Sequence, residues 1–125
     1  MSNSAFRDSI AWQKSMTLST SIYAATKSFP KEEVFGLTTQ LRRASVSIPS
    51  NIAEGKGRLS TGEFIQFLGI ARGSTLEVQT QLEIAMRLGY GNEQELQAVE
   101  ALSIEVLRIL NASLTTLRSR RSKEG

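Results

Sequence analysis

Apolar residues recur every three to four positions through four long stretches of the chain, which is the spacing of amphipathic helices. The stretches cover residues 8–27, a segment that begins near residues 31–33 and ends at 55–57, a segment that opens at 60–63, and residues 92–117. The residues at helical spacing are, in chain order, Trp12, Met16, Ser19, Ile22 and Tyr23; Leu37, Leu41, Ala44, Ile48 and Ile52; Phe64, Phe67, Leu68, Ala71, Thr75, Val78, Leu82, Ala85 and Met86; and Val99, Leu102, Val106, Ile109, Leu110, Ser113, Leu114 and Leu117. This pattern predicts an all-α protein.

Local signals mark the ends of these helices. Pro30 disfavours helical geometry in the residue before it and so ends the first helix. Ser60 with Glu63, and Asn92 with Glu95, have the capping-box spacing in which side chains satisfy backbone amides at a helix start. Short loops between long helices make successive helices antiparallel. We therefore expect an antiparallel up-down-up-down four-helix bundle.

The second helix contains a proline, Pro49, which removes one backbone hydrogen bond. A kink at this point predicts one bent helix that ends at residues 55–57, where glycines suit the left-handed conformation past a helix end. The alternative is a stop at Ile48 and a new start capped by Ser50 or Asn51. We favour one kinked helix, because the second piece would be only one turn long.

The second helix is polar along one flank and small or apolar along its back. The polar stripe beside its core positions consists of Gln40, Arg43, Ser47, Asn51, Glu54 and Arg58. The middle of the back face, which includes Val46, Pro49 and Ala53, carries no Lys or Glu. A solvated helix back usually carries many such charges, so this composition indicates that a second surface covers the helix.

The third helix is also apolar on more than one side. Its predicted contact residues outside the core stripe are Ile65, Gly69, Gly73 and Leu76 on one side, and Ile70, Ile84 and Leu88 on another. A Gly-x-x-x-Gly pair lets another backbone approach closely. Two helices with apolar flanks expose more apolar surface than one bundle hides, which favours a homo-oligomer.

The composition excludes several classes of function. The 125 residues suit one domain, and no apolar run approaches the roughly 20 residues of a membrane span. The polar start, Met1 to Ser4, lacks the apolar stretch of a signal peptide. The chain has no Cys and no His, which removes disulfides, thiolate and imidazole catalysis and Cys/His zinc sites. We expect a cytoplasmic protein that is not an enzyme and has no metal or cofactor.

The net charge of +3 is concentrated at the C-terminus. Residues 118–125 hold four cations and one acid, which leaves 11 basic and 11 acidic residues in residues 1–117. We therefore divide the chain into a four-helix bundle, residues 1–117, and a basic C-terminal tail, residues 118–125. Such a tail attracts phosphate, but for eight residues we favour the simpler explanation of a frayed, solubilising terminus. The candidate phosphate-binding residues are Arg42, Arg43, Lys56, Arg58, Arg118, Arg120, Arg121 and Lys123.

A long motif in the second helix resembles a known family. Residues 40–55 read QLRRASVSIPSNIAEG, and the resemblance continues through residues 57–58, 63–64, 71–77, 12–14 and 29–30. This motif closely resembles the signature of a bacterial four-helix-bundle family. Its members are encoded in intervening sequences within large-subunit ribosomal RNA genes and as chromosomal homologues. The resemblance implies a homopentameric ring.

A similar fold occurs in the accessory protein of diversity-generating retroelements, a basic pentameric barrel that associates with a reverse transcriptase and nucleic acid. By this resemblance we expect a non-enzymatic, nucleic-acid-associated accessory factor. The alternative is a structural oligomer that scaffolds a protein partner without binding RNA or DNA. On the polar stripe of the second helix, Arg43, Asn51, Glu54 and Arg58 can form a charge-assisted network across a subunit interface. The alternative is a phosphate-binding surface, where Arg42, Arg43, Lys56 and Arg58 outnumber Glu54. We favour the network, because polar networks at interfaces commonly supply specificity.

Overall fold

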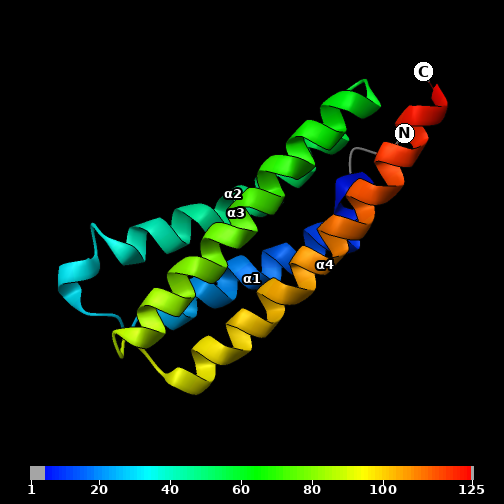
Figure 1. Ribbon diagram of the computed structural model, residues 1–125. Helices are drawn as coiled ribbons and strands as arrows, with labels where there is room; N and C mark the ends of the chain where they lie inside the picture. Colours follow the sequence, from blue (N-terminus) through cyan, green and yellow to red (C-terminus); the bar gives the residue numbers. More distant parts are fainter. Residues whose placement is uncertain (1–4, 125) are drawn as a thin grey trace.

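The computed structural model describes residues 5–124, which contain four long helices, two short 3-10 turns and no strand. The helices are α1 (Ile10–Thr26), α2 (Leu37–Lys56), α3 (Thr61–Arg87) and α4 (Glu93–Glu124), and the turns are η1 (Ala5–Asp8) and η2 (Lys31–Glu33). The helices lie side by side, with the connecting loops at alternate ends of the bundle (Figure 1). The all-α four-helix bundle is thus confirmed. The polar segment Met1 to Ser4 lies outside the described residues.

Capping residues fix the starts of three helices. The hydroxyl of Ser9 accepts a hydrogen bond from the Trp12 amide at 3.3 Å and starts α1 two residues later than the sequence pattern suggests. At α3 the Glu63 amide donates to the Ser60 hydroxyl at 3.1 Å. The Ser60 hydroxyl also donates to the Glu63 carboxylate, which replaces the backbone contact of a full capping box. The Glu95 amide donates to the side-chain oxygen of Asn92 at 2.9 Å, as predicted.

The start of α2 differs from the sequence prediction. Residues 31–33 form the separate turn η2, and the helix begins only at Leu37. The carboxylate of Glu33 folds forward and accepts the Leu37 amide at 2.9 Å, so that a residue four positions upstream satisfies the first turn of α2. Pro49 lies inside one continuous helix, which excludes the alternative of a stop at Ile48. The kink itself stays a prediction.

The expectation that glycine ends α2 through a left-handed residue is wrong. Gly55 is inside the helix and Gly57 has φ −86°, whereas the positive φ angles belong to Gly89 and Gly91 in the α3–α4 loop. A Cβ on Gly55 would lie 2.9 Å from the Phe64 ring and from the Phe67 Cβ. Gly55 is therefore required by the close approach of α2 and α3.

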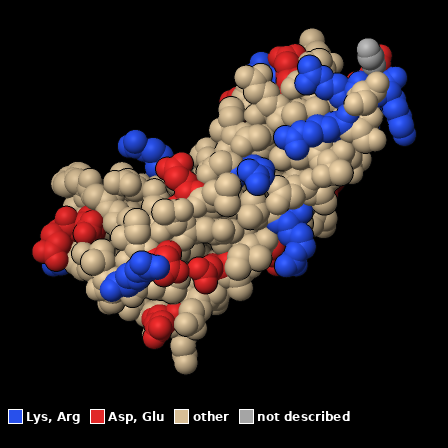
Figure 2. All heavy atoms as spheres, in the orientation of Figure 1, with Lys and Arg blue, Asp and Glu red and all other residues tan. Residues whose placement is uncertain are grey.

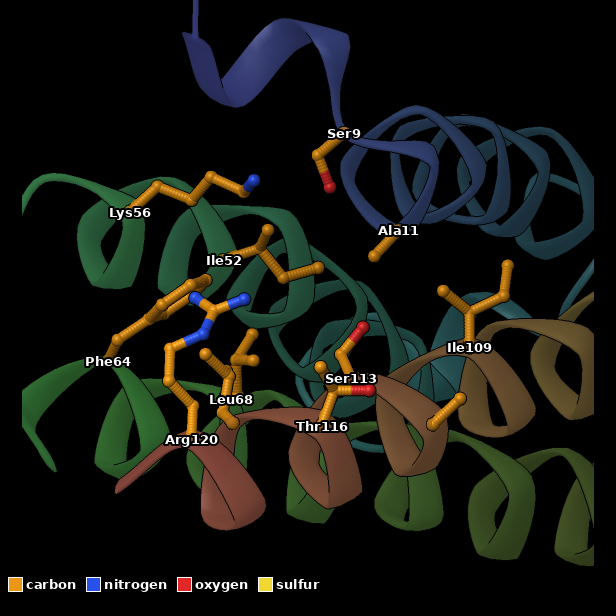
Figure 3. Close-up of a pocket in the computed structure, with 12 residues that line it drawn as sticks. Ser9, Ala11, Ile52, Lys56, Phe64, Leu68, Ile109, Ser113, Thr116 and Arg120 are labelled. Carbon is orange, nitrogen blue, oxygen red and sulfur yellow. The ribbon is translucent and has the colours of Figure 1, made fainter. Parts of the chain in front are cut away.

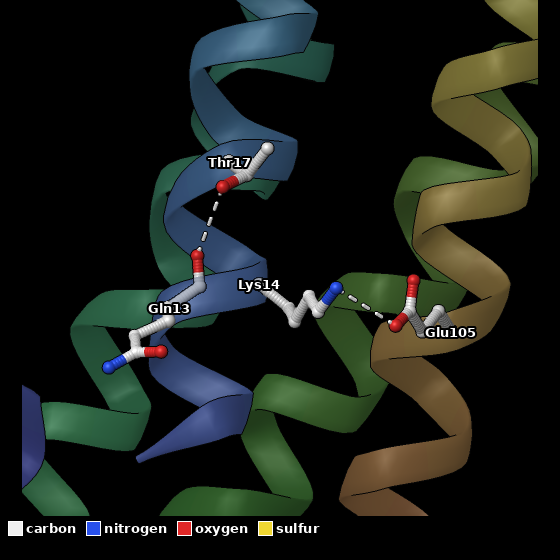
Figure 4. Close-up of polar contacts among 4 residues, drawn as sticks. All are labelled: Gln13, Lys14, Thr17 and Glu105. Atoms are coloured by element: carbon white, nitrogen blue, oxygen red, sulfur yellow. Dashed lines mark hydrogen bonds and ion pairs between the residues drawn. The ribbon is translucent and has the colours of Figure 1, made fainter. Parts of the chain in front are cut away.

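The core runs along the middle of all four helices. The predicted core positions of α2, α3 and α4 are confirmed: Leu41, Ile48, Ile52, Val78, Leu82, Val106, Leu110 and Leu114 are almost completely buried. An ion pair on the outside joins α1 to α4, with Lys14 Nζ 3.1 Å from Glu105 Oε1 (Figure 4). No helix in residues 5–124 is long and apolar enough to cross a membrane.

The predicted face of α1 is partly wrong. Met16 and Tyr23 are about two-fifths exposed, whereas Ala11, Leu18 and Ala25 are buried together with Ile22. Small residues hold α1 close to the other helices, and a search for large apolar side chains overlooks them. As a consequence, the large side chains Trp12 and Met16 border a surface groove and add to the uncovered apolar surface.

At one end of the bundle, side-chain contacts join the α1–α2 loop to the α3–α4 loop. The hydroxyl of Tyr90 donates to Glu33 Oε2 at 2.9 Å, and its ring lies 5.7 Å from that of Phe29. The Leu37 amide and the Tyr90 hydroxyl stabilise the ionised carboxylate and lower the pKa of Glu33. The pKa of Tyr90 is raised, mainly by this hydrogen bond. We call this end, residues 29–37 and 89–91, the loop-locked end.

Candidate nucleic-acid interface

Six of the eight predicted phosphate-binding residues meet at the opposite end of the bundle, where α2 ends, α3 begins and α4 ends. They are Lys56, Arg58, Arg118, Arg120, Arg121 and Lys123. The Thr61 hydroxyl on α3 donates to the Glu124 carboxylate at 3.3 Å, which places the end of α4 beside the start of α3. Figure 2 shows Lys and Arg side chains gathered over this end. We call it the basic end.

The segment separated as a tail is helical through Glu124. Helix α4 runs without a break from Glu93, so the four cations of its last turns project from a continuous scaffold. The guanidinium of Arg121 lies against α3, 3.3 Å from the position of a Cβ on Gly62. Cations in the last turn also interact favourably with the negative end of the helix dipole. The helix therefore gives these charges defined positions.

Aromatic rings and one ion pair orient Lys56, the last residue of α2, and Arg58 in the loop that follows. Arg58 lies with its guanidinium 4.5 Å from the Phe67 ring centre and 3.5 Å from the Glu54 carboxylate. Lys56 Nζ lies 5.8 Å from the centre of the Phe64 ring. Phe64 and Phe67 were predicted as core positions and not as partners of these cations. The close approach of α2 and α3 at Gly55 brings both rings to the end of α2. These cation–π contacts leave most ammonium and guanidinium donors facing solvent.

Acidic residues at the basic end are fewer than basic ones. Residues 50–58, 61–64 and 118–124 carry six Lys or Arg and three Glu. Each glutamate already has a partner: Glu54 pairs with Arg58, Glu63 with Ser60, and Glu124 with Thr61. The surplus of positive charge is therefore available to an anion.

The other two predicted cations, Arg42 and Arg43, lie elsewhere. Fourteen residues separate Arg42 from Lys56, a helical rise of about 21 Å. The Arg42 guanidinium donates to the Thr26 hydroxyl at 2.9 Å and to the Tyr23 carbonyl at 3.4 Å, and it lies 4.7 Å from the Tyr23 ring centre. Arg42 thus fastens α2 to the end of α1, while Arg43 is exposed.

The polar stripe beside the core face of α2 forms hydrogen bonds within α2 and to α3. The Ser74 hydroxyl of α3 donates to the Ser47 hydroxyl at 2.9 Å, and the Asn51 amide donates to the Ser47 carbonyl at 2.8 Å. In residues 5–124 the predicted network among the stripe's charged residues is reduced to the Glu54–Arg58 pair. Gln40 lies exposed at the other end of the stripe.

The predicted contact residues of α3 lie on its outer surface. Gly69 and Gly73 are exposed, and a Cβ on either would meet nothing within 4 Å. Packing within one protomer therefore does not require glycine at these positions. Leu76 is exposed, while Ile65 is partly buried against the core. On the other side of the bundle, Pro49 and Val46 line a groove of about 360 Å³ with Trp12 and Met16.

Comparison with known proteins identifies the family of this bundle. The sequence model of the 23S rRNA-intervening sequence protein family matches residues 7–112. The chain belongs to this family. A crystal structure of a protein of unknown function from the S23 ribosomal protein family of Bacteroides thetaiotaomicron VPI-5482 has the same fold, with a TM-score of 0.76 at 23% identity. The superposition covers 84% of this chain and 98% of that one. No curated protein matches the chain.

The family match divides the basic end. Lys56 and Arg58 lie within the matched residues 7–112 of the 23S rRNA-intervening sequence protein family, whereas the four cations at 118–123 follow them. Within residues 5–124, no three His, Cys, Asp or Glu side chains are grouped so as to hold a metal ion. Two of the six cations of the basic end therefore belong to the part of the chain that the family model covers.

Proposed function

We propose that the protein is a non-enzymatic homo-oligomer that associates with nucleic acid through the phosphates facing its basic end. The observation that carries this proposal is the convergence of six cations from the end of α2, the α2–α3 loop and the end of α4 on one end of the bundle, where the three glutamates are already bonded. Neutralising phosphates with Lys and Arg releases condensed counterions, which is the main source of sequence-independent affinity.

The contacts at the basic end favour phosphate over bases. The Phe64 ring is covered on one face by Lys56, and the Phe67 ring by Arg58. These covered faces are not free to stack on nucleic-acid bases. Binding should be strongly dependent on salt and weakly dependent on sequence.

Self-association is supported by apolar side chains that one bundle leaves uncovered. Val46 is 42% exposed on α2, and Ile70, Ile84 and Leu88 are each more than two-fifths exposed on α3. The exposed Gly69 and Gly73 leave room for a backbone from a second copy. The subunit number of five rests on the family resemblance. In a ring, each basic end would be repeated by every copy, which multiplies the effective affinity for a polyanion.

A non-enzymatic role is supported by the chemistry of the chain. Its sequence contains no His and no Cys. The buried hydroxyls of Ser19 and Ser45 bond to each other at 3.2 Å, and Ser47 bonds to Ser74, so no base activates these serines.

The second candidate function is a scaffold for a protein partner. Its supporting observation is the exposure of two large apolar side chains, Phe35 at 95% and Leu59 at 101%, at opposite ends of α2. A scaffold would assemble equally well but ignore polynucleotides at physiological ionic strength.

Fluorescence anisotropy with a labelled single-stranded RNA, a DNA of the same sequence and the corresponding duplexes tests the proposal. The basic-end variant carries Lys56→Gln, Arg118→Gln, Arg120→Gln and Lys123→Gln. The matched control removes the same charge elsewhere, through Lys27→Gln, Lys31→Gln, Arg43→Gln and Arg108→Gln. If the four basic-end cations each contact a phosphate, the slope of log K against log salt falls by about 3 in the first variant. The control should change the slope little.

Equal losses in the two variants would show that binding follows net charge alone and would contradict the proposed interface. Absence of binding at low salt would favour the scaffold. Sedimentation of the same samples tests assembly separately. A folded, soluble species of 13.7 kDa in dilute solution would end the oligomer proposal.

A further inference from the structure

A cavity of about 450 Å³ opens at the basic end, among the four long helices (Figure 3). Helix α1 contributes its capping residue and first turn, α2 and α3 contribute one wall each, and α4 closes the remaining side. The lining residues are Ser9, Ala11, Ile52, Lys56, Phe64, Leu68, Ile109, Ala112, Ser113, Thr116, Leu117 and Arg120. Its volume lies within the range of small-molecule sites, about 300–1,000 Å³.

The bottom of the cavity is apolar. Ile52, Leu68 and Leu117 are buried core residues whose side chains form the floor. Phe64 and Ile109 are partly buried and form opposite walls. An apolar group placed here would be removed from water on several sides, at a gain of roughly 25 cal/mol for each Å² of apolar surface buried.

The polar groups of the cavity are cations and hydroxyls, without a carboxylate. Lys56 and Arg120 extend across its mouth, and Ser113 and Thr116 of α4 line the cavity nearby (Figure 3). No Asp or Glu lines it, and within residues 5–124 neither Lys56 nor Arg120 has a carboxylate oxygen within 4.0 Å. The first turn of α1, which adds the positive end of a helix dipole, also lacks an acidic residue.

This combination selects for one class of ligand. We propose that the cavity binds a small amphipathic anion, with an apolar chain or ring on the floor and a carboxylate or phosphate head between Lys56 and Arg120. A neutral apolar ligand would form no ion pair with the two cations, and a small hydrophilic anion would leave the apolar floor exposed to water. The site shares Lys56 and Arg120 with the proposed phosphate-binding end, whereas its apolar floor takes no part in that proposal.

Titration with octanoate tests the site, followed by amide correlation spectra of the isotope-labelled protein. A ligand of this size should bind with a Kd on the order of 1 mM. Saturable shifts should appear at cavity residues, and octyl phosphate should behave alike. Octanol, which has the same chain without the charge, should bind about tenfold more weakly.

Two variants separate the charged head from the apolar floor. Lys56→Gln with Arg120→Gln should weaken octanoate about tenfold and leave octanol nearly unchanged. Thr116→Phe, at an exposed position, should block the cavity with every cation retained, and both ligands should then lose binding. Arg43→Gln with Arg108→Gln is the control of equal charge and should bind octanoate normally.

Thermal unfolding establishes that each variant is folded before titration. Failure of octanoate to saturate at about 10 mM, equal affinity for octanol and octanoate, or equal losses in the cavity and control variants would each overturn the proposal. The nucleic-acid experiment remains separate, because Thr116→Phe removes no cation and should retain polyanion binding while losing octanoate.

Discussion

The two ends of the bundle are built differently. At the loop-locked end, Phe29, Glu33 and Tyr90 bond or pack onto one another, and Gly91 fits beneath the Phe29 ring. At the basic end, a cavity remains open and two of the cations at its mouth have no carboxylate partner within 4.0 Å in the described residues. The first arrangement satisfies its polar groups internally, whereas the second keeps charges available. We therefore expect the loop-locked end to contribute more to stability, and the proposed binding sites lie at the basic end.

The largest difference between the ends should come from removing an aromatic ring. Phe29→Ala empties a buried site at the loop-locked end and should lower the free energy of unfolding by about 3–4 kcal/mol. Phe64→Ala, at a partly buried wall of the cavity, should lower it by about 1–2 kcal/mol. Chemical denaturation measures both. A larger loss for Phe64→Ala would reverse the assignment of stability to the two ends.

A pair of glycine substitutions should act in opposite directions on stability. Gly91→Ala places a Cβ 2.9 Å from the Phe29 ring at φ +69°, and should cost about 1–2 kcal/mol. Gly69→Ala meets nothing within 4 Å in an exposed helix and should stabilise the isolated fold by about 0.5–1 kcal/mol.

The same Gly69→Ala variant sharpens the oligomer proposal. If another copy approaches α3 at this glycine, the added methyl group should weaken assembly in sedimentation even though the helix itself is favoured. Unchanged assembly together with higher stability would remove Gly69 from the interface and leave the groove beside α2 as the apolar surface to test.

The loop-locked end should also give the fold a dependence on pH. The pKa of Glu33 is lowered in the folded protein, so its stabilising contribution is present above the unfolded carboxyl pKa of about 4.5 and is lost as pH falls through the lowered value. Glu33→Gln should therefore lower the melting temperature near neutral pH, and the difference from the native protein should shrink in acid. Tyr90→Phe, which removes only the hydroxyl donor, should reproduce part of this effect. A difference that persists unchanged in acid would contradict the role of the charge.

The smallest effect on stability is expected at the mouth of the cavity. Lys56→Gln with Arg120→Gln removes two exposed charges that make no ion pair within the described residues, and should change the free energy of unfolding by less than about 0.5 kcal/mol. Thermal and chemical unfolding both measure this. A substantial loss would mean that the two cations stabilise the fold.

Much of the fold follows from the sequence because local rules suffice for it. Large apolar residues at helical spacing identify the buried faces of α2, α3 and α4, and side-chain caps such as Ser60 and Asn92 place helix starts. The buried face of α1 was predicted only in part, at Ser19 and Ile22, because much of its close packing uses Ala11, Ala25 and Ser15, which carry little hydrophobic signal.

Other features depend on contacts between distant segments, which no local pattern encodes. The start of α2 depends on Glu33, whose carboxylate is held by Tyr90 from 57 positions along the chain. Glycine is needed at position 55 because two aromatic residues of another helix, Phe64 and Phe67, leave no room for a Cβ. The eight candidate phosphate-binding residues could be identified from the sequence. That six of them lie at one end of the bundle and two on the side of α2 became clear only from the packing of the helices.

The continuous helix at residues 118–124 has a thermodynamic consequence. A flexible basic segment must surrender conformational freedom when it meets a polyanion, at roughly 1–2 kcal/mol for each backbone residue that becomes fixed. Here the backbone is already ordered before the encounter, and the Thr61–Glu124 hydrogen bond links it to the neighbouring helix. If the basic end binds a polyanion as proposed, its charges would already be held in an ordered array, and a larger share of the free energy of each phosphate contact would be retained as affinity.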